Sequence, residues 1–141
     1  MVRSGKEGVN LKVSAATSVD WRTSGKITPI KDQAMCGCCW AFTTTAAAES
    51  LFLINNNTNL TVSTEYLLEC TKDSGCDGGY VNLAVRLALQ TGLPSDKKYP
   101  YLAANYSGVL PSTAGICTAQ SDFYKFPSDT TTQNYYNLTS S

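Results

Sequence analysis

The most constraining feature of this sequence is a cluster of three cysteines that opens a long run of helix-forming residues. Cys36, Cys38 and Cys39 fall within four positions, and the run from Trp40 to Ile54 follows them directly. Apolar residues cover most of the circumference that this run would have as a helix, and such a helix belongs in a protein interior. We therefore expect a core built around one long buried helix, with the cysteines at its N-terminal end and Glu49 as a buried structural acid.

Two shorter helices are expected further along the chain. Ser63 and the residues after it provide capping groups just ahead of Leu67, so a short helix should start there. A third helix should run from Tyr80 to Gln90, and Gly92 is well suited to end it. Its apolar stripe would consist of Val81, Ala84, Val85 and Ala88.

Composition excludes several functional classes. A chain of 141 residues makes one domain or a piece of a larger one. Its 11 basic residues balance its 11 acidic residues, which removes the electrostatic footprint of a nucleic-acid binder and gives no attraction to acidic membranes. No stretch approaches the roughly 18 apolar residues of a membrane span. The sequence contains no histidine, so imidazole chemistry cannot be completed within these residues.

The cysteine cluster by itself allows three interpretations. The six cysteines could all form disulfides, in any of 15 pairings. A redox or zinc site is a second option, because the first pair is spaced C-x-x-C; its zinc ligands would be Cys36, Cys39, Cys70 and Cys76. A nucleophilic cysteine is the third, because the positive end of a helix dipole stabilises a thiolate.

Six segments together point to the third interpretation. They are Val19–Arg22, Thr28–Gln33, Cys36–Phe42 (CGCCWAF), Ser63–Cys70 (STEYLLEC), Cys76–Tyr80 (CDGGY) and Tyr99–Tyr101 (YPY). In this order and spacing they resemble the papain family of cysteine proteases, closest to its cathepsin L-like branch, over about residues 19–117. The family signature C-G-[SA]-C-[WY] is matched at every position except Cys38, where serine or alanine is expected.

The resemblance implies an α+β papain-like fold with the active site between two domains. A mainly helical left domain with a long buried central helix would carry the cysteine and occupy residues 19–127. Residues 1–18 would be a flexible lead, such as a propeptide remnant, and residues 128–141 the crossover toward a right barrel domain that is absent. That domain carries the family's histidine and its orienting asparagine, roughly 130–150 residues after the cysteine, which lies beyond Ser141.

Two residues would perform the chemistry that the resemblance implies. Cys39 would attack the scissile carbonyl and form an acyl-thioester. Gln33 would donate a side-chain N–H to the developing oxyanion, beside the backbone N–H of Cys39. Without the neighbouring motifs, Gln33 would be read as an exposed loop glutamine.

Substrate contacts would come from Gly37, Gly78, Gly79 and Tyr80. The glycines would let an extended substrate approach the backbone, since glycine has no Cβ; a plain turn would explain Gly78 and Gly79 equally well. Tyr80 would help to wall the pocket for the second residue before the cut and favour an apolar side chain there. Its alternative is a core residue of its own helix, and Trp40 is as readily explained by packing as by function.

The resemblance also implies a cysteine pairing. Cys36 would bridge to Cys76, and Cys70 to Cys117, which leaves Cys39 and Cys38 free. Cys38 could be a buried substitute for serine, or it could trap Cys39 by oxidation. Ala34 and Met35 replace the family's usual Gly-Ser, a small change provided that residue 34 does not need a positive φ.

We therefore expect a cysteine-type endopeptidase, represented by its N-terminal half and inert on its own. The alternative is a non-catalytic module that binds peptides or inhibitors. Expected partners are a polypeptide substrate, a segment carrying histidine and asparagine, and a cystatin-like or propeptide inhibitor, with no cofactor or metal. The cysteines and four glycosylation sequons indicate a lysosomal, vacuolar or secreted protein; the sequons begin at Asn56, Asn59, Asn105 and Asn137.

Overall fold

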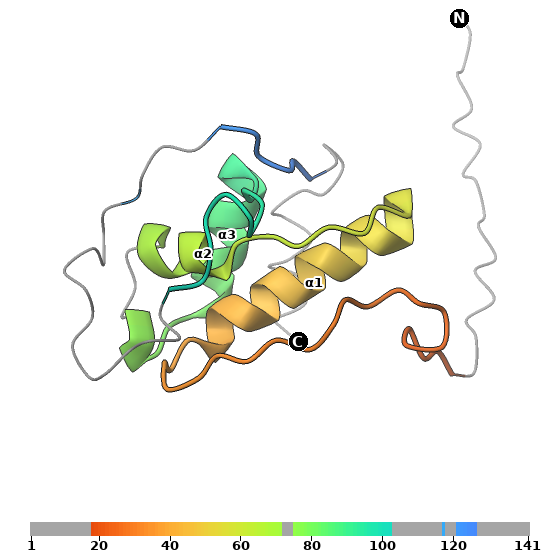
Figure 1. The fold of residues 1–141 in the computed structure, drawn as a ribbon, viewed down its shortest axis with the longest axis horizontal. Coiled ribbons are helices and arrows are strands. Elements are labelled where there is room, and N and C mark those ends of the chain that lie inside the picture. Colours follow the sequence, from red (N-terminus) through yellow and green to blue (C-terminus); the bar gives the residue numbers. More distant parts are fainter. Residues whose placement is uncertain (1–17, 72–74, 103–116, 118–120, 127–141) are drawn as a thin grey trace, which may run out of the picture.

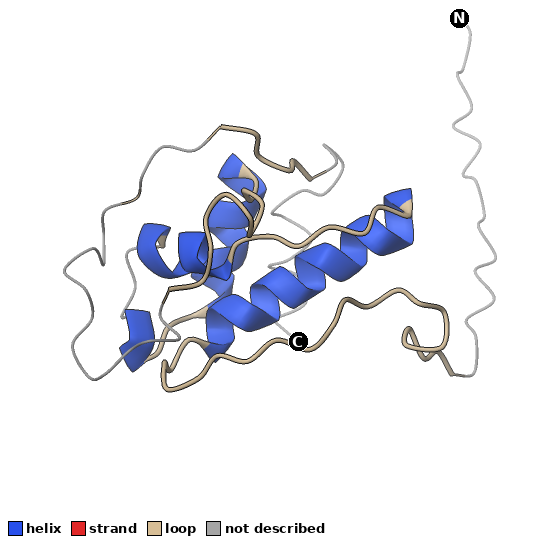
Figure 2. Cartoon of the chain, viewed as in Figure 1, coloured by secondary structure: helices blue, strands red, loops and turns tan. Residues whose placement is uncertain are grey.

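The computed structural model describes residues 18–71, 75–102, 117 and 121–126. These ranges contain the helices α1 (Cys39–Asn56), α2 (Thr64–Cys70) and α3 (Val81–Thr91) and the short 3₁₀ helix η1 (Gly75–Asp77). Within them β pairing is limited to two isolated bridges, so the described part is helical, as Figure 2 shows. This agrees with the helix-rich left domain of a papain-like fold. The expectations for residues 1–17 and 127–141 lie outside the described residues.

Helix α1 is the long central helix that the sequence predicts. It begins one residue before Trp40 and ends two residues after Ile54. Asn57 follows it with a φ of 52°, and its N–H donates to the Leu53 carbonyl, which closes the last turn. The predicted acid, Glu49, is completely buried.

The two shorter helices begin and end at the residues whose chemistry favours it. The Ser63 hydroxyl accepts a hydrogen bond from the Tyr66 N–H at 2.9 Å and so caps α2. Helix α3 starts at Val81, one residue later than expected, because Tyr80 has extended backbone angles. Gly92 ends it with a φ of 85° and donates its N–H to the Ala88 carbonyl.

The helices and the N-terminal segment lie on different sides of α1. Helices α2 and α3 lie against one side, whereas residues 18–38 run along the other, as Figure 1 shows. The core lies where the three helices meet, and its members include Ala41, Phe52, Val62, Leu67, Ala84 and Leu93. Helix α1 therefore separates a packed layer from the segment that carries Gln33.

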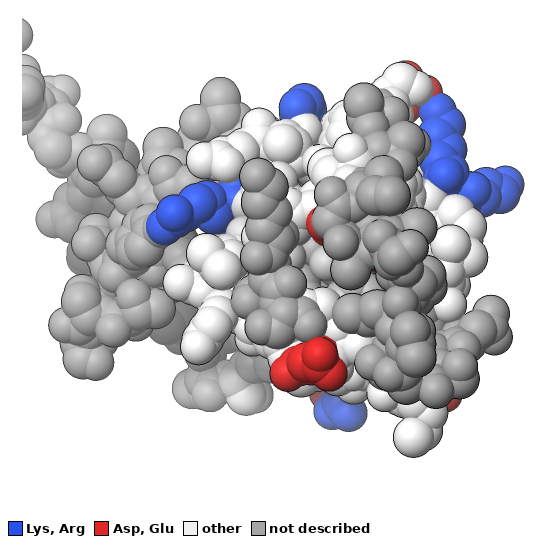
Figure 3. Space-filling model, turned by 90° about the vertical axis from the view of Figure 1, so that its left-hand side faces the viewer, with Lys and Arg blue, Asp and Glu red and all other residues white. Residues whose placement is uncertain are grey.

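Charged residues make up 16% of the sequence, below the usual share of about 25%. On the face shown in Figure 3, basic and acidic side chains lie scattered, and neither sign gathers into a patch. None of the helices in the described ranges combines the length and the apolar character that crossing a membrane requires.

Candidate active site

Cys39 is the first residue of α1, and its side chain is exposed. It is the one cysteine of the six that is both free and exposed, because four of the others form disulfides and Cys38 is buried. The N–H groups of the first helical turn have no acceptors within the helix and favour a negative charge. The sequence therefore places a free, accessible thiol at the positive end of an 18-residue helix.

Two disulfides frame this thiol. Cys36 is bonded to Cys76, and Cys70 to Cys117, which are the pairs that the resemblance implies. An all-disulfide framework is therefore wrong, because two thiols stay free. The zinc set is also wrong, because Cys36, Cys70 and Cys76 cannot act as thiolate ligands while they form disulfides. In the part of the chain that the structure describes, no three metal-ligating side chains of the usual kinds gather into a site.

Gln33 lies in the segment that leads to the cysteine cluster. Its side-chain amide donates to the Cys36 carbonyl at 2.8 Å, and its own carbonyl accepts from the Cys36 N–H at 3.4 Å. The side chain is half-buried, so Gln33 is not a freely exposed loop glutamine. A primary amide has two N–H donors. Among the described residues, the acceptor of the Gln33 side chain is the Cys36 carbonyl, which occupies one of them.

The glycine-rich segment after η1 is joined to the start of α1 by close backbone contacts. The Gly37 N–H donates to the Cys76 carbonyl at 2.8 Å, and a Cβ on Gly37 would come within 2.4 Å of that oxygen. A Cβ on Gly79 would come within 2.5 Å of the Trp40 ring, which is itself buried. These two glycines are required by packing, whether or not a substrate also approaches them.

Gly78 and Tyr80 lie differently from these two glycines. Gly78 has a φ of 113°, and a Cβ there would meet open space. Tyr80 is 68% exposed just before α3, so its interpretation as a core residue is wrong. The structure thus holds an exposed aromatic ring and a glycine with open space beside it on the segment that the Cys36–Cys76 disulfide ties to Cys39.

The turn between Gln33 and Cys36 contains a strained residue. Ala34 has a φ of 52°, in the left-handed region that favours glycine. The Asp32 carboxylate accepts a hydrogen bond from the Ala34 N–H at 2.8 Å and helps to hold this turn. Alanine in place of the family's usual glycine is therefore not a small change at position 34, because this residue does adopt a positive φ.

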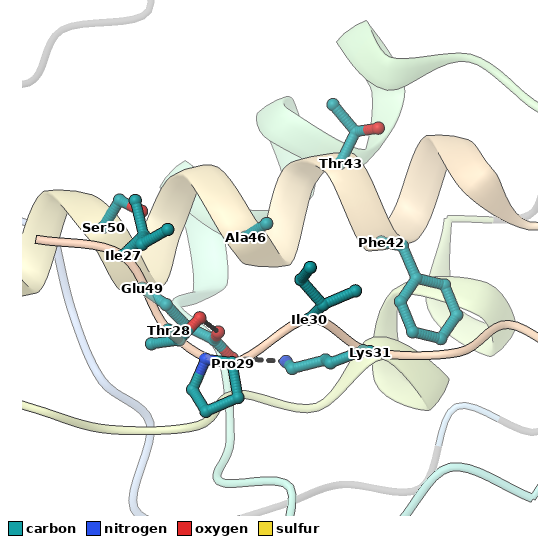
Figure 4. A pocket seen from close by; sticks show the side chains of 10 residues that line it. All are labelled: Ile27, Thr28, Pro29, Ile30, Lys31, Phe42, Thr43, Ala46, Glu49 and Ser50. Carbon is teal, nitrogen blue, oxygen red and sulfur yellow. Dashed lines mark hydrogen bonds and ion pairs between the residues drawn. The ribbon is translucent and has the colours of Figure 1, made fainter. Parts of the chain in front are cut away.

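A pocket of about 370 Å³ lies between the N-terminal segment and α1 (Figure 4). Ile30 and Phe42 lie along it, and Lys31 reaches across its floor to Glu49. A second hollow of about 440 Å³ includes Gln33 and Phe42 among its lining residues. Neither includes Cys39, so the surface next to the thiol is not enclosed by these two hollows.

One residue near the site had no role assigned from the sequence. Tyr101 belongs to the Tyr-Pro-Tyr segment, and its hydroxyl lies 3.1 Å from the Cys38 sulfur. The same hydroxyl donates to the Gln33 carbonyl at 2.9 Å. Only the tertiary fold brings residues 33, 38 and 101 together, so the motif by itself carried no signal of this contact.

Comparison with known proteins identifies the family. Residues 15–141 match the model of the papain family cysteine proteases. A senescence-specific cysteine protease, SAG39, from Oryza sativa subsp. indica is 42% identical over 103 residues, which cover 70% of this chain and 30% of the rice protein. A cathepsin L-like proteinase from Fasciola hepatica is 40% identical over 88 residues, 60% of this chain and 27% of that protein.

Solved structures of cysteine proteases are also similar to this chain. The crystal structure of the Carica candamarcensis cysteine protease CMS1MS2, in complex with E-64, superimposes with a TM-score of 0.60 and 36% sequence identity. The match covers 62% of this chain and 42% of that one. The chain belongs to the papain family of cysteine proteases, and it spans about a third or less of the length of the two curated relatives.

Proposed function

We propose that this chain supplies the nucleophile and the oxyanion donors of a cysteine-type endopeptidase. The observation that carries the proposal is the placement of Cys39. It is the one cysteine of six that is both free and exposed, and it begins the central helix. Membership of a family of cysteine proteases gives this thiol a specific reaction, hydrolysis of a peptide bond.

The reaction would proceed through an acyl-thioester. The Cys39 thiolate attacks the scissile carbonyl carbon, a C–S bond forms, and the carbonyl π electrons move to the oxygen. Collapse of this oxyanion breaks the C–N bond, and the amine leaves with a proton from an imidazolium. Water then attacks the thioester, and the thiolate is released with the acid product.

The developing oxyanion would be held by two donors from this chain. One is the backbone N–H of Cys39, and the other is the second N–H of the Gln33 amide. Donors of this kind contribute roughly 3 kcal/mol each to the transition state in another protease. Gly37, Gly78 and Gly79 would line the path of an extended substrate, and the exposed Tyr80 ring would contact its second residue before the cut.

The general base would come from outside these residues. The 141 residues contain no histidine, so we infer that a further segment, in the same or another chain, supplies the imidazole and its orienting asparagine. Residues 19–127 would then form the left domain and residues 128–141 the crossover to the right domain. Without that imidazole, Cys39 lacks a base and an ion-pair partner, and we expect the 141-residue chain to be proteolytically inert.

A peptide-hydrolysis assay with two preparations tests the proposal. The chain alone should show no turnover, whereas the chain joined to its histidine-bearing segment should hydrolyse a fluorogenic peptide. E-64 should abolish that turnover and add its mass once, to the peptide that contains Cys39. Cys39→Ser should remove both activity and labelling, whereas Thr43→Ser, an exposed change one turn along the same helix, should remove neither.

Two outcomes would contradict the proposal. Turnover by the chain alone that E-64 inhibits would show that no external imidazole is needed. A completed enzyme that binds peptides but never cleaves them, with unchanged affinity in Cys39→Ser, would favour the non-catalytic binding module.

The disulfides and the glycosylation sequons support a proposal for the cellular location of the protein. Two disulfides persist in oxidising compartments, and Asn56 and Asn59 are exposed and so accessible to glycosylation. Asn105 and Asn137 lie outside the described residues. We therefore propose a lysosomal, vacuolar or secreted location, with polypeptides as substrates and cystatin-like or propeptide segments as inhibitors.

A further inference from the structure

The buried Cys38 thiol has no part in the reaction proposed above. Its side chain is 0% exposed, although its neighbour in the sequence, Cys39, faces solvent. The Cys38 sulfur lies 3.1 Å from the Tyr101 hydroxyl, within hydrogen-bond distance. The geometry of this contact by itself does not decide which atom is the donor.

The second contact of Tyr101 decides the direction. Its hydroxyl donates to the Gln33 carbonyl at 2.9 Å, and a carbonyl oxygen can only accept. A tyrosine hydroxyl has one proton, so that proton is committed to Gln33. The hydrogen bond to Cys38 therefore needs the Cys38 S–H as donor and the Tyr101 oxygen as acceptor.

The protonation states agree with this direction. Burial raises the pKa of the Cys38 thiol, so the sulfur keeps its proton at neutral pH. Burial also raises the pKa of the Tyr101 hydroxyl, and the contact with Cys38 adds to this effect. Both groups are neutral, as a relay from thiol to hydroxyl to carbonyl requires.

The relay joins the oxyanion glutamine to the start of α1. Cys38 immediately precedes Cys39, and the other end of the relay is the backbone of Gln33. Tyr101 is held in place by its ring, which meets the Phe42 ring edge to face with centroids 5.0 Å apart. Among the described residues, the Gln33 carbonyl also accepts a longer hydrogen bond, from the Cys36 N–H at 3.4 Å.

We propose that Cys38 is a positioning residue, whose thiol holds Tyr101 and, through it, the Gln33 backbone at a fixed place relative to Cys39. The inference rests on the proposed function, because that function assigns Gln33 and Cys39 to one reaction. Serine at position 38 would keep the relay, since its hydroxyl is a donor, whereas alanine would break it.

Infrared spectroscopy tests the relay without any enzyme activity. In the Cys39→Ser variant, Cys38 is the single remaining thiol, so the S–H stretching band belongs to it alone. Adding Tyr101→Phe removes the acceptor but keeps the ring against Phe42. The band should move to higher wavenumber, as expected when a donor loses its hydrogen bond. An unmoved band would overturn the relay.

A second measurement covers the case in which Tyr101→Phe folds poorly. Hydrogen exchange of the Cys36 N–H reports on the Gln33 carbonyl that accepts from it. Cys38→Ala should speed this exchange, and Cys38→Ser should restore the original rate. Equal exchange rates in all three chains would contradict the proposal.

Kinetics of the enzyme completed with its histidine-bearing segment test the positioning role. Cys38→Ala and Tyr101→Phe should each lower kcat about two- to tenfold per site titrated with E-64, with KM unchanged. The double variant should be no slower than the slower single variant, because both changes break one relay, and Cys38→Ser should restore kcat. A role in folding alone would lower the titrated fraction but leave kcat per site unchanged, and that result would overturn the proposal.

The two proposals fail in different ways. If the completed, unsubstituted enzyme shows no turnover, the proposed function is wrong and the infrared band still decides the relay. If turnover is normal but the band does not move, the relay is wrong and the proposed function stands.

Discussion

The two sides of helix α1 are held by different forces. Toward α2 and α3 it packs against apolar side chains such as Leu67 and Ala84, which are fully buried. On the other side, the N-terminal segment leaves apolar side chains of its own in solvent, with Ile30 100% exposed and Met35 82% exposed. The packed side gives the domain its core, and the open side must hold the segment that carries Gln33 by other means.

Those means are polar, and three of the hydrogen bonds meet at Glu49. Its buried carboxylate accepts hydrogen bonds from the Thr28 hydroxyl and the Lys31 ammonium, each at 2.5 Å. It also accepts from the Val62 N–H at 2.9 Å, just ahead of α2. One carboxylate on α1 thus tethers the segment on the open side and the chain that enters the packed side.

Removal of this carboxylate should have the largest effect. Glu49→Ala leaves the Val62 N–H and the partly buried Lys31 ammonium without their acceptor, and breaking such a pair costs about 3–5 kcal/mol. Urea unfolding of the chain should show this loss in the free energy of unfolding. Thr43→Ala, on an exposed position of the same helix, is the control and should change it by no more than about 0.5 kcal/mol. A loss below about 1 kcal/mol in Glu49→Ala would mean that the tether does not hold the open side.

The packed side was easier to predict from the sequence than the open side. The apolar run after Trp40, the Ser63 cap and Gly92 are local signals, and they placed both ends of α1 and α3 and the start of α2 to within two residues. The positive φ of Ala34 and the link from Tyr101 to Gln33 depend on contacts between distant segments. Local patterns carry no information on such contacts, which is why the family motifs predicted candidate site residues but not the geometry around them.

The packed side contains a buried acid of a different kind. Glu69, on α2, accepts a hydrogen bond from the Tyr99 hydroxyl, a neutral group. Burial raises the pKa of the Glu69 carboxyl to about 7, and the nearby charge of Glu65 raises it as well. Glu49 has a lysine beside it, whereas Glu69 has a second acid near it, so ionisation of Glu69 opposes folding.

The stability of the chain should therefore depend on pH. Glu69 has a pKa of about 7 when folded against an ordinary value of 4.5, so the folded state binds more protons between these pH values. The contribution of the Glu69 carboxyl to the free energy of unfolding is fully present below pH 4.5 and is lost as the pH rises through about 7. The loss amounts to about 3 kcal/mol at most, since each pKa unit is worth about 1.4 kcal/mol.

Thermal unfolding between pH 4.5 and pH 8 measures this effect. Glu69→Gln should flatten the decline of Tm with pH, and Glu65→Gln should move the midpoint of the decline to lower pH. A decline that is unchanged in Glu69→Gln would assign the pH dependence to another group.

The smallest predicted effect concerns the backbone of the open side. Ala34 is held at a φ of 52°, which costs a residue with a Cβ roughly 1–2 kcal/mol relative to glycine. Ala34→Gly removes this strain but increases the freedom of the unfolded chain, so we expect a net gain of about 0.5–1 kcal/mol in urea unfolding. The matched control is Ala47→Gly, the same chemical change at an exposed position within α1. It should cost about 1 kcal/mol, because glycine is a poor helix former. Changes of opposite sign in the free energy of unfolding for Ala34→Gly and Ala47→Gly would show that strain is stored in the turn next to Gln33 and not in the helix. A loss of stability in Ala34→Gly would contradict this and show that the turn is relaxed.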